Sequence, residues 1–237
     1  MTSHIHPSWQ PIVSAALEGL PSEYRRFLEE ESGYFPDRYN FLNAFKTLPL
    51  ERTRYILFGQ DPYPRRESAI GYAFIDGKVP AIFNEKGLSK EVNRATSLRN
   101  FIKMLLHCEG ALRGDYSKEA LSHVDTTGYI DSIAQLRENF EKNGVLLLNM
   151  ALVFTTKEES RAHVKAWRGF VERLIAMLQN RGIELILFGR IAEEVEKIEE
   201  AKAFVKHTLP HPYNISFITD PKAHALFGPM RLLQSIR

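Results

Sequence analysis

Residues 55–63 read YILFGQDPY, a short apolar run that ends at a glycine and passes directly into polar residues. Two further runs have the same form, VLLL at 145–148 and IELILF at 183–188, and AFVKHTL at 203–209 is a fourth candidate. Short apolar runs of this kind are typical of strands buried on both faces, as in a parallel sheet. The sequence therefore predicts an α/β fold with a central four-stranded parallel sheet flanked by helices.

Between these runs, apolar residues recur at helical spacing. The stretches with this pattern are 97–107, 129–142, 166–180, 191–201 and 222–236. Gly228 and Pro229 are expected to interrupt the last of them. Residues 1–32 are expected to form a helical lead-in of two helices, whereas 108–128 is polar and has no clear pattern. No repeat or Gly/Ser/Pro-rich linker divides the chain, so a single domain over 1–237 is the simpler interpretation.

The composition is that of a globular protein. Of the 237 residues, 44% are hydrophobic and 25% are charged, which excludes a disordered chain. The formal net charge of +2 excludes a histone-like nucleic-acid binder but allows a local basic patch. The single cysteine, Cys108, excludes an intramolecular disulfide framework and a cysteine-rich zinc site.

The N-terminal residues lack the basic and apolar segments of a secretory signal. No stretch reaches the roughly 20 apolar residues that are needed to span a bilayer. A lone cysteine also suits a reducing compartment. We therefore expect a soluble, cytoplasmic protein that does not associate with a membrane.

Polar side chains follow three of the four predicted strands at the point where each strand ends. Asp61 follows the first strand, Asn149 the second and His211 the fourth. Because ligands bind beyond the carboxyl ends of parallel strands, we expect this acid, amide and imidazole to converge at one edge of the sheet. No glycine-rich phosphate loop, metal-ligand spacing or Gly-x-Ser-x-Gly motif is present, so neither a cofactor nor a metal is expected.

Each of these residues also has an ordinary structural alternative. Asp61 would cap a turn before Pro62, and Asn149 would satisfy nearby backbone at a strand end. His211 would be a loop histidine, and Phe74 would belong to the core. The residue types alone leave these alternatives open.

Six segments carry a resemblance to the uracil-DNA glycosylase family, and they occur in that family's order. They are GQDPY at 59–63, IGYAF at 70–74, SLRNFIKML at 97–105, VLLLN at 145–149, AWRGF at 166–170 and HPYNIS at 211–216. The resemblance covers roughly 34–216, with gaps. The Asp-Pro-Tyr triplet is similar to the uracil-specific family 1 branch rather than to the mismatch or thermophile branches.

The resemblance implies a three-layer sandwich and a hydrolase of DNA base excision repair. Such an enzyme flips uracil out of single- or double-stranded DNA, hydrolyses the N-glycosidic bond, and leaves free uracil and an abasic site. It is expected to act as a monomer without a metal or cofactor. Two alternatives stay open: a glycosylase of the superfamily with a different or broader damaged-base specificity, and a non-catalytic uracil-DNA binder.

The reaction assigns a task to each strand-end residue. Cleavage builds positive charge on the sugar, which the Asp61 carboxylate would stabilise while orienting the attacking water. His211 would donate a hydrogen bond to the uracil oxygen that gains charge, and a neutral imidazole suffices for this. Asn149 can both donate to and accept from the edge of a base, which would distinguish uracil from cytosine.

Further roles follow only from the resemblance. In the base pocket, Gln60 would hold the base or water, Tyr63 would exclude the methyl group of thymine, and Phe74 would stack on the base. On the DNA backbone, Ser97 and Ser216 would bind phosphates, although Ser97 equally fits a helix N-cap. Ile215 would wedge into the stack that the flipped base vacates.

The sequence departs from the family's pattern near these segments. Pro64 stands where the family usually has histidine, and proline has no N–H to donate. Tyr213 and Asn214 replace a Ser-Pro pair. His163 lies one position away from a family histidine, so no role is assigned to it, and 82–93 is an apparent insertion.

Overall fold

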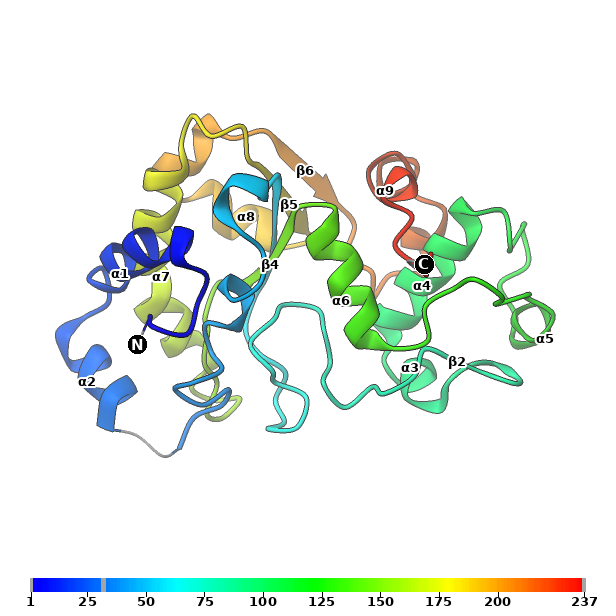
Figure 1. Cartoon of the computed structure of the whole chain (residues 1–237), viewed down its shortest axis with the longest axis horizontal. Coiled ribbons are helices and arrows are strands. Elements are labelled where there is room, and N and C mark those ends of the chain that lie inside the picture. Colours follow the sequence, from blue (N-terminus) through cyan, green and yellow to red (C-terminus); the bar gives the residue numbers. More distant parts are fainter. Residues whose placement is uncertain (1, 31–32, 236–237) are drawn as a thin grey trace. The chain divides into compact units, whose positions relative to one another are not determined.

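The structure is a computed structural model, in which residues 2–30 and 33–235 are described. The chain forms two compact units, whose helices and strands are labelled in Figure 1. The first unit comprises Met1–Asp76 and Gly144–His207, and the second comprises Gly77–Asn143 and Thr208–Arg237. A single domain over 1–237 stays a prediction.

The predicted α/β class, with a four-stranded parallel sheet flanked by helices, is confirmed for the described residues. The strands of the sheet are β4 (Val145–Asn149), β1 (Tyr55–Gly59), β5 (Glu184–Phe188) and β6 (Lys206–Leu209), in that spatial order. β1 pairs in parallel with both β4 and β5, which places Gly59 opposite Asn149. β6 begins three residues later than the predicted 203–209 strand, because a 3-10 turn over Glu199–Ala203 precedes it.

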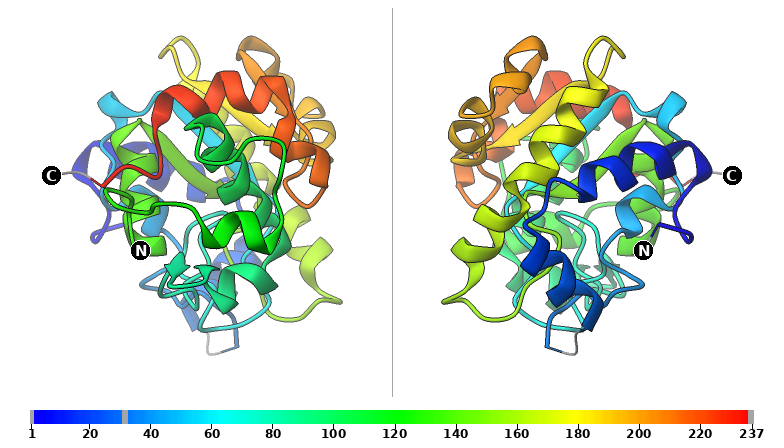
Figure 2. Two further views of the ribbon diagram at one scale, coloured as in Figure 1. Left: turned by 90° about the vertical axis from the view of Figure 1, so that its right-hand side faces the viewer. Right: turned by 90° about the vertical axis from the view of Figure 1, so that its left-hand side faces the viewer.

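The first unit packs helices on this sheet. They are α1 (Gln10–Leu17), α2 (Ser22–Glu30), α7 (Ser160–Leu178) and α8 (Ile191–Glu196), with 3-10 turns at Pro7–Trp9, Asn43–Phe45 and Leu50–Arg52. Figure 2 shows α1 beside α7, where a Cβ on Gly19 would lie 2.3 Å from the carbonyl oxygen of Gly169. The two helices predicted within 1–32 are present, and residues 1, 31 and 32 of that range lie outside the described residues.

The helix α7 begins at Ser160, six residues before the predicted 166–180 helix. Its additional first turns carry His163 on the buried face, where only 5% of that residue is exposed. A buried histidine continues the core-facing stripe of the helix but is not an apolar residue. For that reason the hydrophobic pattern that predicts the rest of α7 does not extend to this end.

The second unit is built around the long helix α4. Its elements are β2 (Phe83–Asn84), β3 (Gly87–Leu88), α3 (Lys90–Arg94), α4 (Thr96–Cys108), α5 (Lys118–Ser122), α6 (Ile133–Lys142) and α9 (Pro221–Phe227), with 3-10 turns at Ile215–Thr219 and Gly228–Met230. The left view of Figure 2 shows α9 beside α4, and the rings of Phe101 and Phe227 meet edge to face at 5.0 Å.

Two helix boundaries in this unit differ from those predicted. The 129–142 helix begins at Ile133, because Ser132 and Gln135 form a capping box that fixes the start. The 222–236 helix ends at Phe227, as the following Gly-Pro pair led us to expect, and Ile236 lies outside the described residues. No helix in the described ranges is long and apolar enough to cross a membrane.

Candidate active site

The ends of β1 and β4 form the best-defined part of the site, and they fit together only because residue 59 is glycine. A Cβ at Gly59 would lie 2.2 Å from Oδ1 of Asn149. Asn149 itself is buried, with 6% of its surface exposed. Beyond the strands, the backbone N–H groups of Met150 and Ala151 donate to the carbonyl oxygens of Gly59 and Gln60, each at 2.9 Å. These main-chain bonds hold the segment that follows Asn149 at the carboxyl end of the sheet, and the Asn149 side chain lies against Gly59.

We expect Gly59→Ala to lower the free energy of unfolding by about 1–3 kcal/mol, because the added methyl group overpacks a buried contact. Urea unfolding of the purified variant measures this change. Gly33→Ala is the matched control, since a Cβ at Gly33 meets nothing within 4 Å. Equal stability of the two variants would contradict the close fit between Gly59 and Asn149.

Asp61 lies in the loop that follows β1, and its carboxylate is held by a side chain far away in sequence. Ser160, the first residue of α7, donates a hydrogen bond from Oγ to Oδ2 of Asp61. Ser160 is only 9% exposed, and its contact with Asp61 is partly buried. No sequence motif indicated Ser160, which is separated from Asp61 by 99 positions.

A directional chain of hydrogen bonds anchors the same end of α7. Trp167 Nε1 donates to the Tyr24 hydroxyl at 3.1 Å, and the Tyr24 hydroxyl contacts Nδ1 of His163. His163 Nε2 contacts Thr155 Oγ1 at 2.7 Å, and Thr155 in turn donates to Glu159 at 2.5 Å. Each hydroxyl has one proton to donate. Tyr24 donates its proton to Nδ1 of His163, whereas Thr155 donates its proton to Glu159 and so accepts from Nε2 of His163. The proton of the neutral His163 ring therefore lies on Nε2.

The environment of His163 keeps its imidazole neutral. Burial lowers the pKa of His163, and this effect outweighs the opposing influence of the Glu159 and Asp61 carboxylates. Burial likewise raises the pKa of the Tyr24 phenol, so this hydroxyl keeps its proton. Sequence reasoning set His163 aside because of its one-position offset, yet it lies one turn from the residue that binds Asp61.

Tyr63 and Phe74 form a second pair of predicted site residues in the first unit. The Tyr63 hydroxyl donates to the carbonyl oxygen of Phe74 at 3.0 Å. Phe74 has a φ of 67°, which is a costly conformation for an aromatic residue. Its ring is half-buried and meets that of Phe188 with 6.2 Å between centroids. Phe74 is therefore not a fully buried core residue, and such strained backbone tends to occur at functional sites.

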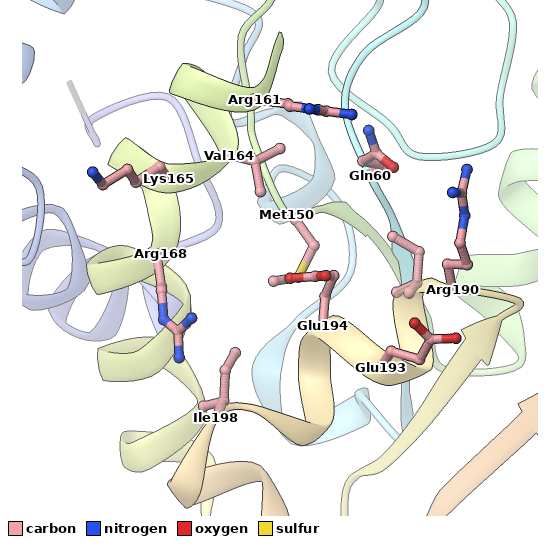
Figure 3. A pocket seen from close by; sticks show the side chains of 11 residues that line it. Gln60, Met150, Arg161, Val164, Lys165, Arg168, Arg190, Glu193, Glu194 and Ile198 are labelled. Atoms are coloured by element: carbon pink, nitrogen blue, oxygen red, sulfur yellow. The ribbon is translucent and has the colours of Figure 1, made fainter.

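Gln60 lines a pocket of about 570 Å³ in the first unit, shown in Figure 3. Its charged lining residues are Arg161, Lys165, Arg168, Arg190, Glu193 and Glu194. Some of these charges are neutralised locally, since Arg168 binds Glu172 at 2.7 Å and Lys197 binds Glu194 at 2.7 Å. Sequence reasoning did not single out this pocket, because its lining residues come from four separate segments.

In the second unit, the loop that follows β6 carries His211. The backbone N–H of Tyr213 donates to Nδ1 of His211 at 3.0 Å, so Nδ1 is the acceptor and the proton of the neutral ring lies on Nε2. Buried Asn100 of α4 holds this loop, because its Nδ2 donates to the carbonyl oxygens of Pro212 at 2.8 Å and Tyr213 at 3.2 Å. Desolvation lowers the pKa of His211, which favours the neutral imidazole.

The same loop presents two apolar side chains to solvent. Tyr213 is 67% exposed and Ile215 is 78% exposed, although Asn100 fixes the backbone beneath them. Ser216 follows in the 3-10 turn and is also exposed. Ser97 is the second residue of α4, whose N-cap is Ala95, so the alternative that Ser97 is an N-cap is wrong.

The structure thus groups the predicted residues within each unit. The first unit holds Gln60, Asp61, Tyr63, Phe74 and Asn149, and the second holds Ser97, His211, Ile215 and Ser216. The expected convergence of Asp61, Asn149 and His211 stays a prediction. Among the described residues, His, Cys, Asp and Glu side chains form no cluster of three that could hold a metal ion.

Comparisons with known proteins point to one family, although no family model matches the chain. In sequence, the chain is similar to the uracil-DNA glycosylase of Enterococcus faecalis, with 29% identity over 222 residues that cover 91% of this chain and 85% of that protein. In structure, it is similar to the UNG crystal structure from Nitratifractor salsuginis, with a TM-score of 0.96 and 53% identity over 98% of this chain and 94% of the other. The mimivirus uracil-DNA glycosylase shares the fold, with a TM-score of 0.57 and 19% identity over 87% of this chain and 68% of the other.

Proposed function

The chain belongs to the uracil-DNA glycosylase family, and on that premise we propose how its residues remove uracil from DNA. The protein hydrolyses the N-glycosidic bond of deoxyuridine in DNA, which releases free uracil and leaves an abasic site for base excision repair. The observation that carries this function is the 53% identity over 98% of the chain to the Nitratifractor salsuginis UNG structure. The strand-end residues Asp61, Asn149 and His211 supply the side chains that the reaction needs.

Asp61 acts on the deoxyribose. As the glycosidic bond lengthens, positive charge develops on the sugar, and the nearby carboxylate stabilises it. The same carboxylate orients the water molecule that attacks the sugar carbon. The Ser160 hydroxyl donates to Oδ2, which supports Oδ1 as the oxygen that faces the reacting atoms. The proton that the water loses passes to this carboxylate once the oxygen has bonded to the sugar carbon.

The remaining residues of the first unit recognise the base. The Asn149 amide donates to one polar atom of uracil and accepts from its neighbour, a pattern that cytosine does not offer. Phe74 stacks on the flipped ring, and Tyr63 occupies the space where thymine carries its methyl group. The contact of Asn149 with Gly59 and the bond from Tyr63 to Phe74 support these roles, because both hold the recognising groups rigid. Gln60 binds the base or the attacking water from the same strand end.

His211 stabilises the departing uracil. Negative charge gathers on a uracil oxygen as the bond breaks, and the Nε2–H of a neutral imidazole donates to it. The bond from the Tyr213 backbone to Nδ1 supports this tautomer. A permanently protonated histidine is not needed, because a hydrogen bond to a developing anion is already strong.

The direction of the His211 pKa shift gives an expected pH dependence. Because desolvation lowers the pKa of His211 below 6.5, the neutral form is present throughout the range above 6.5 and is lost only at more acidic pH. We expect kcat/KM for uracil release to stay level between about pH 6.5 and 8. The profile of His211→Gln serves as control, since any decrease shared by both proteins does not arise from His211. If kcat/KM of the wild-type protein alone fell on acidification with a midpoint above pH 7, this result would contradict the lowered pKa of His211.

The second unit binds DNA. Ile215 enters the gap left by the flipped base, which its high exposure supports, and Ser97 and Ser216 bind the adjoining phosphates. The small net charge of +2 predicts a moderate affinity that falls with salt. We further propose that the protein acts as a cytoplasmic monomer on single- or double-stranded DNA, because one flipped nucleotide needs only one set of these side chains.

An excision assay tests the proposed function. The protein is incubated with single- and double-stranded oligonucleotides that carry one uracil, and abasic sites are then cleaved with alkali. We expect strand cleavage at the uracil position. Oligonucleotides with hypoxanthine, xanthine or a thymine mismatch test a broader specificity, and binding without cleavage would identify a non-catalytic binder. Absence of cleavage at high enzyme concentration would contradict the proposal.

A further inference from the structure

We infer that Ser160 is a positioning residue for the catalytic carboxylate of Asp61. Its hydroxyl donates to Oδ2 and so fixes the rotation of the carboxylate, which leaves Oδ1 turned toward the sugar and the attacking water. Ser160 acts through Asp61 and touches neither the base nor the sugar. The inference rests on the role proposed above for Asp61.

The loop after β1 gives Asp61 little support of its own. The next residues are Pro62, Tyr63 and Pro64, and neither proline has an N–H that could donate to a carboxylate. The Tyr63 hydroxyl is already committed to the carbonyl oxygen of Phe74. The support comes instead from α7, where Ser160 is placed by a helix that begins within the same unit.

The first turn of α7 is fixed well enough to hold a side chain in one place. Glu159, which directly precedes Ser160, accepts from Thr155, and Thr155 contacts His163 one turn further along. The backbone N–H of His163 also donates to the carbonyl oxygen of Glu159 at 3.0 Å. On the other side of the His163 ring, the Tyr24 hydroxyl contacts Nδ1 and accepts a hydrogen bond from Trp167. The Ser160 hydroxyl therefore loses little freedom when it binds Asp61.

The chemistry of the contact also suits a positioning role. A hydroxyl that donates to a carboxylate forms a charge-assisted bond, which is stronger than a bond between neutral groups. The serine bond is therefore well suited to keep the Asp61 carboxylate oriented.

Ser160→Ala and Ser160→Thr test the inference by steady-state kinetics on uracil-containing DNA. We expect Ser160→Ala to lower kcat about 10- to 100-fold, as for loss of a bond to a charged group, while KM changes less than about twofold. Ser160→Thr keeps the hydroxyl and should recover most of kcat. Ser117→Ala is the matched control, because it removes a serine at the start of another helix, α5, far from the site in sequence. Its kcat should equal that of the wild-type protein.

A double-mutant cycle separates positioning from a purely structural role. If Ser160 acts through Asp61, Ser160→Ala should lower single-turnover uracil release by less than about twofold when Asp61→Asn is already present. An equal loss in both backgrounds, or a loss that Ser160→Thr does not recover, would overturn the inference. Failure of the wild-type protein to release uracil is a different result, and it would overturn the proposed function instead.

Discussion

Replacing Asp61 with asparagine is expected to lower kcat for uracil release by about 10³-fold, while the affinity for uracil-containing DNA changes less than about twofold. The substitution keeps the shape of the side chain but removes the negative charge that stabilises the sugar cation. Ser160 still contacts the residue at this position, so the loop after β1 should keep its conformation. Single-turnover release of uracil measures the rate, and fluorescence anisotropy with labelled DNA measures binding.

Asp37→Asn is the matched control for this experiment. Asp37 accepts a hydrogen bond from the backbone N–H of Tyr39 at 3.0 Å, so it is an aspartate that caps a turn in the same unit. This is the ordinary alternative for Asp61. If Asp61→Asn loses DNA binding and stability together with activity, as loss of a structural turn would predict, the catalytic assignment of Asp61 is wrong.

Replacing Asn149 with aspartate is expected to lower the preference for uracil over cytosine by about 10³-fold, because a site built on hydrogen bonds discriminates through them. A carboxylate only accepts, so it opposes the carbonyl oxygen of uracil and suits the amino group of cytosine. The ratio of kcat/KM values for oligonucleotides with a single uracil or a single unpaired cytosine measures the effect.

Asn139→Asp controls for the burial of a new carboxylate. Asn139 is 4% exposed and Asn149 is 6% exposed, and Asn139 donates to main-chain carbonyl oxygens at 2.8 and 2.9 Å in the second unit. This variant should lose stability but keep the wild-type preference for uracil. An unchanged preference in Asn149→Asp would remove Asn149 from base recognition.

The sheet and the strand-end residues could be predicted because their signals are local. Each of the runs at 55–58, 145–148 and 183–188 is almost wholly apolar, and this is what a strand covered on both faces requires. The polar residues that follow mark the carboxyl end of each strand. The spatial order of the strands was not predicted, because it depends on which runs pair across long separations in sequence.

The hydrogen bond that supports the Asp61 carboxylate could not be predicted, because it joins residues that are distant in sequence. Ser160 has no motif, and its partner Asp61 is 99 positions away. His163 is a buried polar residue, which an apolar helical pattern cannot register. The close contact at Gly59 could not be predicted either, because glycine is required there by the side chain of Asn149 on the paired strand.

Local hydrogen bonds hold the predicted site residues, or the segments beside them, in place. Main-chain bonds hold the segment after Asn149, a side-chain bond joins Tyr63 to Phe74, and Asn100 holds the loop that carries His211. In the proposed function, each bond fixes a residue that would meet developing charge or contact the base. Preorganisation of this kind lowers the reaction barrier, since the site does not need to rearrange as charge appears.

The most direct test of the central claim is the amount of free uracil released per abasic site formed in one turnover. Wild-type protein in excess over a uracil-containing duplex should release one uracil for each alkali-sensitive site, and Asp61→Asn should slow both signals by the same factor. Strand cleavage without free uracil, or release of uracil that is equally fast in Asp61→Asn, would contradict hydrolysis of the glycosidic bond with Asp61 as the stabilising carboxylate.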